Sequence, residues 1–317
     1  GIRDCLLSRG LGMCIRDSYK YAVRNEGPKF FSKAKDAYFW DIDGNKFVDL
    51  ICGWGPMILG YNNPVIDKAA QEQYSLGNTV SVASPVMIEL AETLVDTVEI
   101  AEWALFGKNG GDSTQLAVMI SRQETGKNKV LKIDGGYHGA NGWMQREGSP
   151  GTIDSDSSEV ISIPWNSIEE FDSAISNFGN EISCFISSPF HHPTSEDNVL
   201  PKKGYWEYIQ KVCNEKNIII IVDDVRTGFR IDLAGSNKAF NFSPDLVCLG
   251  KAIANGYPIS ALVGKNHLKE AANKVYFSGT QFFNSAPMAA AIALSLIHIS
   301  EPTRQEAMSY AVFCLKK

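Results

Sequence analysis

The chain has 317 residues, with 30 Lys and Arg against 36 Asp and Glu, so its formal net charge is −6. Because a domain commonly takes about 150 residues, this length predicts one large or two ordinary domains with a substantial core. The acidic balance argues against a nucleic-acid-binding protein, and no apolar run approaches the roughly 20 residues that cross a bilayer. Seven cysteines without a C-x-x-C pair indicate neither a disulfide framework nor a zinc site, so a cytosolic location is expected.

The two ends of the chain differ in character from its middle. Residues 1–18 lack the apolar core of a signal peptide, and residues 295–317 follow a small-residue helix pattern and then change abruptly. Both pieces resemble translated sequencing-adapter DNA, notably MCIRDS near the start and SLIHISEPTR near the end. We therefore expect both pieces to be adapter-derived artefacts and leave them out of the fold prediction.

The first elements of the remaining chain lie in an N-terminal segment, residues 19–80. Short aromatic and β-branched runs in residues 30–50 surround Asp43-Gly44, a two-residue hairpin signal, and predict a small antiparallel meander. Two helices are expected to follow, one beginning at Pro64 after Asn63 and one beginning at Pro85 after Ser84.

Strand and helix signals then alternate through residues 81–294, the predicted large domain. Strands are expected at residues 103–107, 130–133, 160–163, 184–187, 218–222, 246–249 and 259–263, and helices begin near residues 112, 167 and 205. Apolar strands that alternate with helices predict an α/β fold, with a mostly parallel central sheet covered by helices on both faces. Ligands of such sheets bind at the carboxyl ends of the strands.

Three chemically distinctive features occur at such strand ends. The glycine-rich run 106–111 precedes a helix and could approach a phosphate, although an ordinary tight turn would look the same. Asp223 follows the most hydrophobic strand, where a carboxylate needs a partner, which could be Arg226 or Arg230. Lys251 ends another strand, where it could reach solvent or serve as a Schiff-base amine. Together these features suggest pyridoxal phosphate (PLP), which needs a lysine, an acid for its ring nitrogen and a phosphate cradle.

From about residue 28 to residue 294, the chain resembles the fold-type I, class-III aminotransferases, most closely their glutamate-1-semialdehyde aminomutase branch. The motifs that carry this resemblance are residues 39–44, 54–60, 137–139, 223–230, 244–251 and 279–280. The resemblance implies that Lys251 forms the internal aldimine and moves the substrate proton, while Asp223 keeps the pyridine nitrogen protonated. It also implies a homodimer with a shared active site.

The same resemblance implies further cofactor contacts. Val225 and Tyr137 would cover the two faces of the ring, and Asn109, Gly110, Gly111 and His138 would also lie in the cofactor site. Thr280 would reach the phosphate in the other subunit, and Trp54 would line the substrate pocket. Trp54 and Tyr137 could instead be plain core aromatics.

The chain departs from the family at several of these positions. The phosphate loop reads Asn109-Gly-Gly-Asp-Ser113 in place of S-G-T-E-A, and Ser187-Ser-Pro189 replaces V-E-P. His191 and His192 follow and are expected to face solvent without binding a metal. These changes favour an aminotransferase acting on a small amino donor and a carbonyl acceptor over an aminomutase. An inactive PLP-binding remnant is the other alternative, because the family's small C-terminal domain is expected to be missing.

Overall fold

The computed structural model describes residue 28, residues 30–193 and residues 197–300. These residues form two compact units, the first comprising the residues up to 52 together with 59–63, the second comprising 53–58 and the residues from 64 onward. The expected artefact at residues 1–18 lies outside the described residues, as does most of the one at 295–317. None of the described helices is long and apolar enough to cross a membrane.

The first unit contains the expected antiparallel meander. Its strands β1 (Phe31–Lys35), β2 (Tyr38–Asp41) and β3 (Lys46–Val48) pair in the order β1-β2-β3. The hairpin between β2 and β3 turns at Gly44, whose φ of +87° is costly for other residues. The carboxylate of Asp41 accepts the backbone N–H groups of Asp43 and Asn45 and closes this turn.

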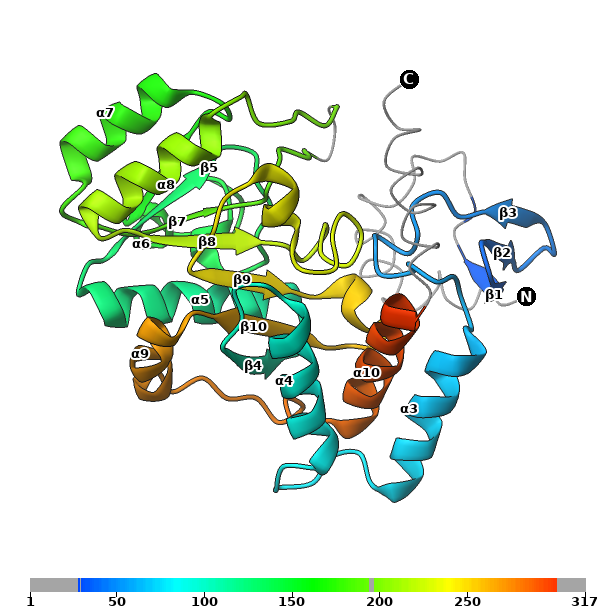
Figure 1. Ribbon diagram of the computed structural model, residues 1–317. Helices are drawn as coiled ribbons and strands as arrows, with labels where there is room; N and C mark the ends of the chain where they lie inside the picture. Colours follow the sequence, from blue (N-terminus) through cyan, green and yellow to red (C-terminus); the bar gives the residue numbers. More distant parts are fainter. Residues whose placement is uncertain (1–27, 29, 194–196, 301–317) are drawn as a thin grey trace. The chain divides into compact units, whose positions relative to one another are not determined.

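The second unit is built on a 7-stranded sheet with the strand order β4-β10-β9-β8-β7-β5-β6 (Figure 1). The strands are β4 (Trp103–Gly107), β5 (Lys129–Ile133), β6 (Val160–Ile163), β7 (Ile182–Ser187), β8 (Ile219–Asp223), β9 (Leu246–Leu249) and β10 (Ser260–Gly264). Strands β5 to β9 run parallel to one another, whereas β10 is antiparallel to both β4 and β9. The mostly parallel α/β sheet expected from the sequence is thus confirmed.

Helices cover both faces of this sheet, with α7 and α8 on one side and α5 on the other (Figure 1). The α-helices of this unit are α3 (Pro64–Leu76), α4 (Pro85–Thr97), α5 (Gly110–Thr125), α6 (Asp154–Ser157), α7 (Ile168–Phe178), α8 (Tyr205–Lys216), α9 (Lys269–Lys274) and α10 (Ser285–Ser300). Every residue of β7, β8, β9 and β10 is buried, as expected for strands packed between helices. Helix α10 continues past residue 294, where the adapter-like piece is expected to begin, so that boundary stays a prediction.

Candidate active site

The carboxyl ends of four strands meet at one edge of the sheet. Ser187 of β7 pairs with Val222, and Asp223 at the end of β8 pairs with Cys248 in β9. Strand β10 is antiparallel to β9 and β4, so the carboxyl end of β4 lies at the same edge. The loops after these strands carry most of the chemically distinctive residues that the sequence singles out, and parallel sheets bind their ligands at this edge.

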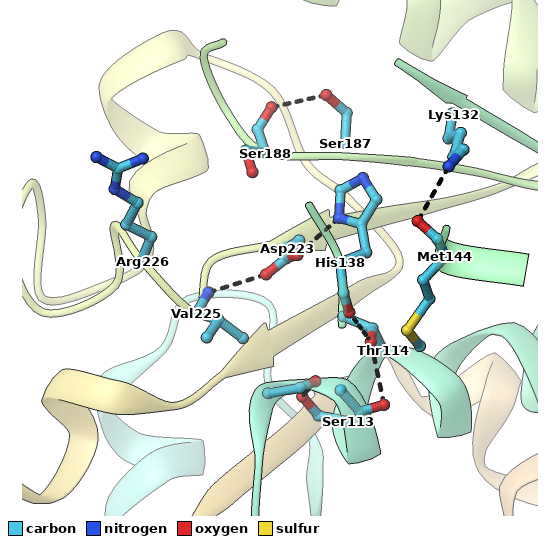
Figure 2. A network of polar contacts seen from close by, with 12 residues as sticks. Ser113, Thr114, Lys132, His138, Met144, Ser187, Ser188, Asp223, Val225 and Arg226 are labelled. Carbon is cyan, nitrogen blue, oxygen red and sulfur yellow. Dashed lines mark hydrogen bonds and ion pairs between the residues drawn. The ribbon is translucent and has the colours of Figure 1, made fainter. Parts of the chain in front are cut away.

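Asp223 is 5% exposed, and its carboxylate is paired with a histidine. Oδ2 of Asp223 lies 2.7 Å from Nδ1 of His138, and Oδ1 accepts the backbone N–H of Val225 at 3.2 Å (Figure 2). His138 itself is 3% exposed. The partner of the buried carboxylate is thus an imidazole, and Arg226, one of the two partners considered from the sequence, donates to His192 instead.

Lys251 opens η4 (Lys251–Ala254), a 3₁₀ helix that directly follows β9. Its φ of +46° is unusual for a residue with a side chain, and such backbone strain is concentrated at functional sites. Burial lowers the pKa of Lys251, the Asp223 carboxylate opposes this shift, and the cations Arg226 and Arg230 add to it. A larger fraction of this amine is therefore neutral than in an ordinary lysine, as a nucleophile or base requires.

The glycine-rich loop leaves two backbone donors at the start of α5. The carboxylate of Asp112 accepts the N–H groups of Lys108 and Asn109, both at 2.8 Å. The N–H groups of Gly110 and Gly111 have no hydrogen-bond partner among the described residues. Free N–H groups at the positive end of a 16-residue helix suit a phosphate.

The Val225 side chain packs against both the glycine-rich loop and the residue before Lys251. A Cβ on Gly110 would lie 2.6 Å from Cγ1 of Val225, and one on Gly250 would lie 3.2 Å from the same atom. The two glycines therefore allow the Val225 side chain to pack between the start of α5 and the residue before Lys251. The Val225 backbone N–H donates a hydrogen bond to the Asp223 carboxylate. The start of α5, Asp223 and Lys251 therefore lie in one compact group around Val225.

The remaining expected site residues are exposed. Tyr137 is 65% exposed and Trp54 is 60% exposed, which excludes the alternative of plain core aromatics for both. The Trp54 backbone also has a positive φ, +68°. Asn109 and Thr280 are also exposed, and the Thr280 side chain makes no hydrogen bond with the described residues.

The expectation that His191 and His192 face solvent is wrong. The His192 side chain is only partly exposed and packs beside Phe190, with its Nε2 buried and its Nδ1 2.9 Å from Nη1 of Arg226. Burial, with a smaller contribution from Arg226, lowers the pKa of His192 to about 4. His191 stacks on Trp165 with a centroid separation of 6.1 Å. The apolar flank of Pro189 and Phe190 was the signal in the sequence for this burial. No group of three or more potential metal ligands occurs in the described part of the chain.

Comparison with known proteins adds three relationships. The family model described as "Aminotransferase class-III" matches residues 21–309. The chain is 38% identical over 267 residues to an aminopentol aminotransferase of Sphingopyxis macrogoltabida, covering 84% of this chain and 63% of that protein. It is 35% identical over 275 residues to a glutamate-1-semialdehyde 2,1-aminomutase of Methanocaldococcus jannaschii, covering 82% of this chain and 64% of that protein. The chain therefore spans slightly less than two thirds of both relatives.

A solved structure supports the same relationship. The PLP internal aldimine form of the Sphingopyxis sp. MTA144 FumI protein aligns with a TM-score of 0.86 and 34% identity. The alignment covers 93% of this chain and 74% of that structure.

Proposed function

The chain belongs to the class-III aminotransferase family, and from this premise we propose that it is a PLP-dependent aminotransferase. It would move an amino group between a small amino compound and a carbonyl acceptor. The observation that carries the proposal is the compact group of Lys251, Asp223 and the two free N–H groups of Gly110 and Gly111. These are the amine, the acid and the anion donors that PLP requires.

The residues of this group fit the cofactor. The Lys251 amine would bind the aldehyde, the Asp223 carboxylate would face the ring nitrogen, and the Gly110 and Gly111 N–H groups would bind the phosphate. When bound, PLP withdraws electrons from the substrate α-carbon. Val225 and the exposed ring of Tyr137 would cover the two ring faces, with His138 behind the Asp223 carboxylate.

Lys251 would also act on the substrate. Its lowered pKa leaves a neutral amine that could take the proton from the substrate α-carbon and return it at C4′ of the cofactor. The cations that lower this pKa, Arg226 and Arg230, stay charged while the lysine changes its protonation state. Trp54 would line the substrate pocket, in keeping with its exposed indole.

The test is reconstitution with PLP, comparing wild type with Lys251→Ala and with Lys127→Ala as a matched control. Lys127 is another partly buried lysine, but its Nζ donates to the carbonyl of Lys216 at 2.7 Å, away from the group. We expect a visible absorption band in wild type and Lys127→Ala and its loss in Lys251→Ala. Equal spectra in all three proteins would end the proposal.

Substrate assays then separate transfer from internal rearrangement. Candidate amines are added one at a time, with and without a carbonyl acceptor. An aminotransferase turns over continuously only when both are present, whereas an aminomutase turns over one substrate alone. Binding of PLP without either reaction would identify a non-catalytic PLP-binding protein.

The proposal includes a homodimer that shares its active sites through Thr280. Hydrogen bonds from Thr79 to Asn284, and from Ser285 at the start of α10 to Asn78, connect the loops at residues 77–84 and 275–284. They and the end of α3 carry exposed apolar side chains, namely Tyr74, Leu76, Val80, Val82, Tyr276 and Phe283. Analytical ultracentrifugation should give a dimer mass that Leu76→Asp reduces to that of a monomer. A monomeric wild type would contradict this part of the proposal.

A cytosolic location is also proposed, supported by four unpaired cysteines among the described residues.

A further inference from the structure

The His138 ring has one nitrogen whose partner is known and one whose partner is not. Nδ1 faces the Asp223 carboxylate at 2.7 Å, and an ionised carboxylate only accepts hydrogen bonds, so Nδ1 carries the hydrogen. In the neutral ring, Nε2 is then an acceptor. This Nε2 is buried and has no hydrogen-bond partner among the described residues. A buried polar atom without a partner is energetically unfavourable, so a partner for Nε2 is expected.

The His192 ring has the opposite arrangement, with its Nδ1 accepting a hydrogen bond and its Nε2 carrying the hydrogen. Its Nδ1 lies 2.9 Å from Nη1 of Arg226, which also donates to the His192 carbonyl at 2.9 Å. Because a guanidinium only donates, Nδ1 of His192 must accept, and the hydrogen is on Nε2. The low pKa of His192 agrees with a neutral ring. Its Nε2 is also buried without a partner in the described part of the protein.

Both rings line the same small pocket, together with Ile133, Gly136, Ser187, Ser188, Phe190 and His191. The pocket has space for about one water molecule. Figure 2 shows the edge of the His138 ring that faces away from Asp223 directed toward Ser187 and Ser188. Ser187 Oγ donates its own hydrogen to the Ser188 carbonyl at 2.8 Å, so its lone pairs can accept another.

We propose that one buried water bridges Nε2 of His192 and Nε2 of His138 and completes a hydrogen-bond chain from Arg226 to Asp223. Arg226 donates to His192, His192 to the water, the water to His138, and His138 to Asp223. The second hydrogen of the water goes to Ser187 Oγ, which gives the water three partners, the number typical of buried water. The direction of the chain is fixed because a guanidinium can only donate and a carboxylate can only accept.

His192 and Arg226 are therefore positioning residues. They keep the free nitrogen of His138 an acceptor, so the other nitrogen always donates to the Asp223 carboxylate. Under the proposed function, that carboxylate faces the cofactor ring nitrogen, so this consequence rests on that proposal. The chain of hydrogen bonds itself does not depend on the cofactor, and it is tested without it.

The direct test is a crystal structure of the full chain without PLP, at a resolution that shows ordered water. We expect one water within hydrogen-bonding distance of both Nε2 atoms and of Ser187 Oγ. A pocket with no water, or a water that contacts only one of the rings, would overturn the bridge. Failure of the chain to bind PLP would end the proposed function and leave this result unaffected.

Nitrogen-15 NMR of the labelled histidines tests the tautomers. The chain has five histidines, and single substitutions assign their signals. We expect hydrogen on Nδ1 in His138 and on Nε2 in His192. In His192→Phe the N–H donor that holds the water is lost, so the hydrogen bond from the water to His138 should weaken and the His138 Nε2 signal should move downfield. His192→Gln retains an N–H donor and should return the signal toward wild type.

Two further variants complete this experiment. Arg226→Met should let the His192 hydrogen exchange between its nitrogens, whereas His267→Gln, at a half-exposed histidine beside Asp245, should leave both signals unchanged. Thermal melts check that each variant is folded. A wild-type His192 with its hydrogen on Nδ1 would refute the proposal without any variant. An unmoved His138 signal in folded His192→Phe would do the same.

Discussion

The Cβ that Gly110 lacks would lie 2.6 Å from Cγ1 and 2.8 Å from Cγ2 of Val225. Real Cβ atoms do not approach other carbon atoms so closely, so the first residue of α5 and the residue two positions after Asp223 can meet only because one of them is glycine. This contact couples the phosphate-type loop to the Asp223 loop. Substitutions at this pair therefore test how rigid the candidate site is.

Gly110→Ala should lower the free energy of unfolding by about 1–3 kcal/mol, the usual cost of overpacking. It should also weaken PLP binding, because α5 must move relative to Val225. Val225→Ala makes room for the new methyl group, so the double variant should be more stable than the sum of the two single changes predicts. Urea unfolding of the four proteins measures this coupling. If the two changes in the free energy of unfolding are additive, the contact between Gly110 and Val225 does not restrict a side chain at position 110.

Asp112 should stabilise the protein mainly as a hydrogen-bond acceptor and only to a smaller extent through its negative charge. Asp112→Ala leaves the N–H groups of Lys108 and Asn109 without an acceptor and should cost about 1–2 kcal/mol. Both bonds are accepted by Oδ2, so Asp112→Asn can keep an oxygen there and should cost only about 0.5 kcal/mol through the helix dipole. Equal losses in the two variants, measured by thermal unfolding, would contradict this assignment.

Lys251 should destabilise the protein without cofactor in a way that depends on pH. Its pKa is lowered from 10.5 in the folded chain, so between the folded value and 10.5 the unfolded chain binds the proton and the folded chain does not. Stability therefore rises with pH across this window. Lys251→Met should be more stable than wild type at pH 7, and the difference should shrink as the pH approaches 10.5. Urea denaturation of both proteins at several pH values measures this difference in the free energy of unfolding.

Lys127→Met is the control for this prediction. The Lys127 amine is also partly buried with a lowered pKa, but it donates to the carbonyl groups of Gly179, Lys216 and Asn217. Loss of these donors should destabilise the protein by about 1–3 kcal/mol. A more stable Lys127→Met, or a less stable Lys251→Met, would contradict the expected changes in the free energy of unfolding.

The buried cysteines should resist alkylation in the native protein. Cys184, Cys213 and Cys248 are fully buried, and burial raises the pKa of Cys184 to about 11 and also raises that of the other two. Iodoacetamide at pH 8 should modify them at least about a hundredfold more slowly than in urea, because reaction requires local opening. Of the four cysteines that the structure describes, Cys52, which is partly exposed, should react first. Peptide mass spectrometry gives the order, and rapid native modification of Cys248 would contradict it.

The order and type of the main elements could be read from the sequence because their signals are local. The strands at 103–107, 160–163 and 246–249 have the expected bounds, and α3 and α4 begin at the expected prolines. Helix α5 begins at Gly110, before the expected residue 112, because the glycines take part in its first turn. Helices α6 and α9, with 4 and 6 residues, are too short to show a helical period and were not predicted.

The identity of the acid, the lysine and the glycine-rich loop also came from the sequence, since each follows an apolar strand and parallel strands end at a common edge. Which side chains meet there was decided only by the tertiary structure. His138 and Asp223 are 85 residues apart and His192 and Arg226 are 34 apart. A hydrogen-bond partner depends on strand register and on the packing of several loops at once, and no local pattern encodes that combination.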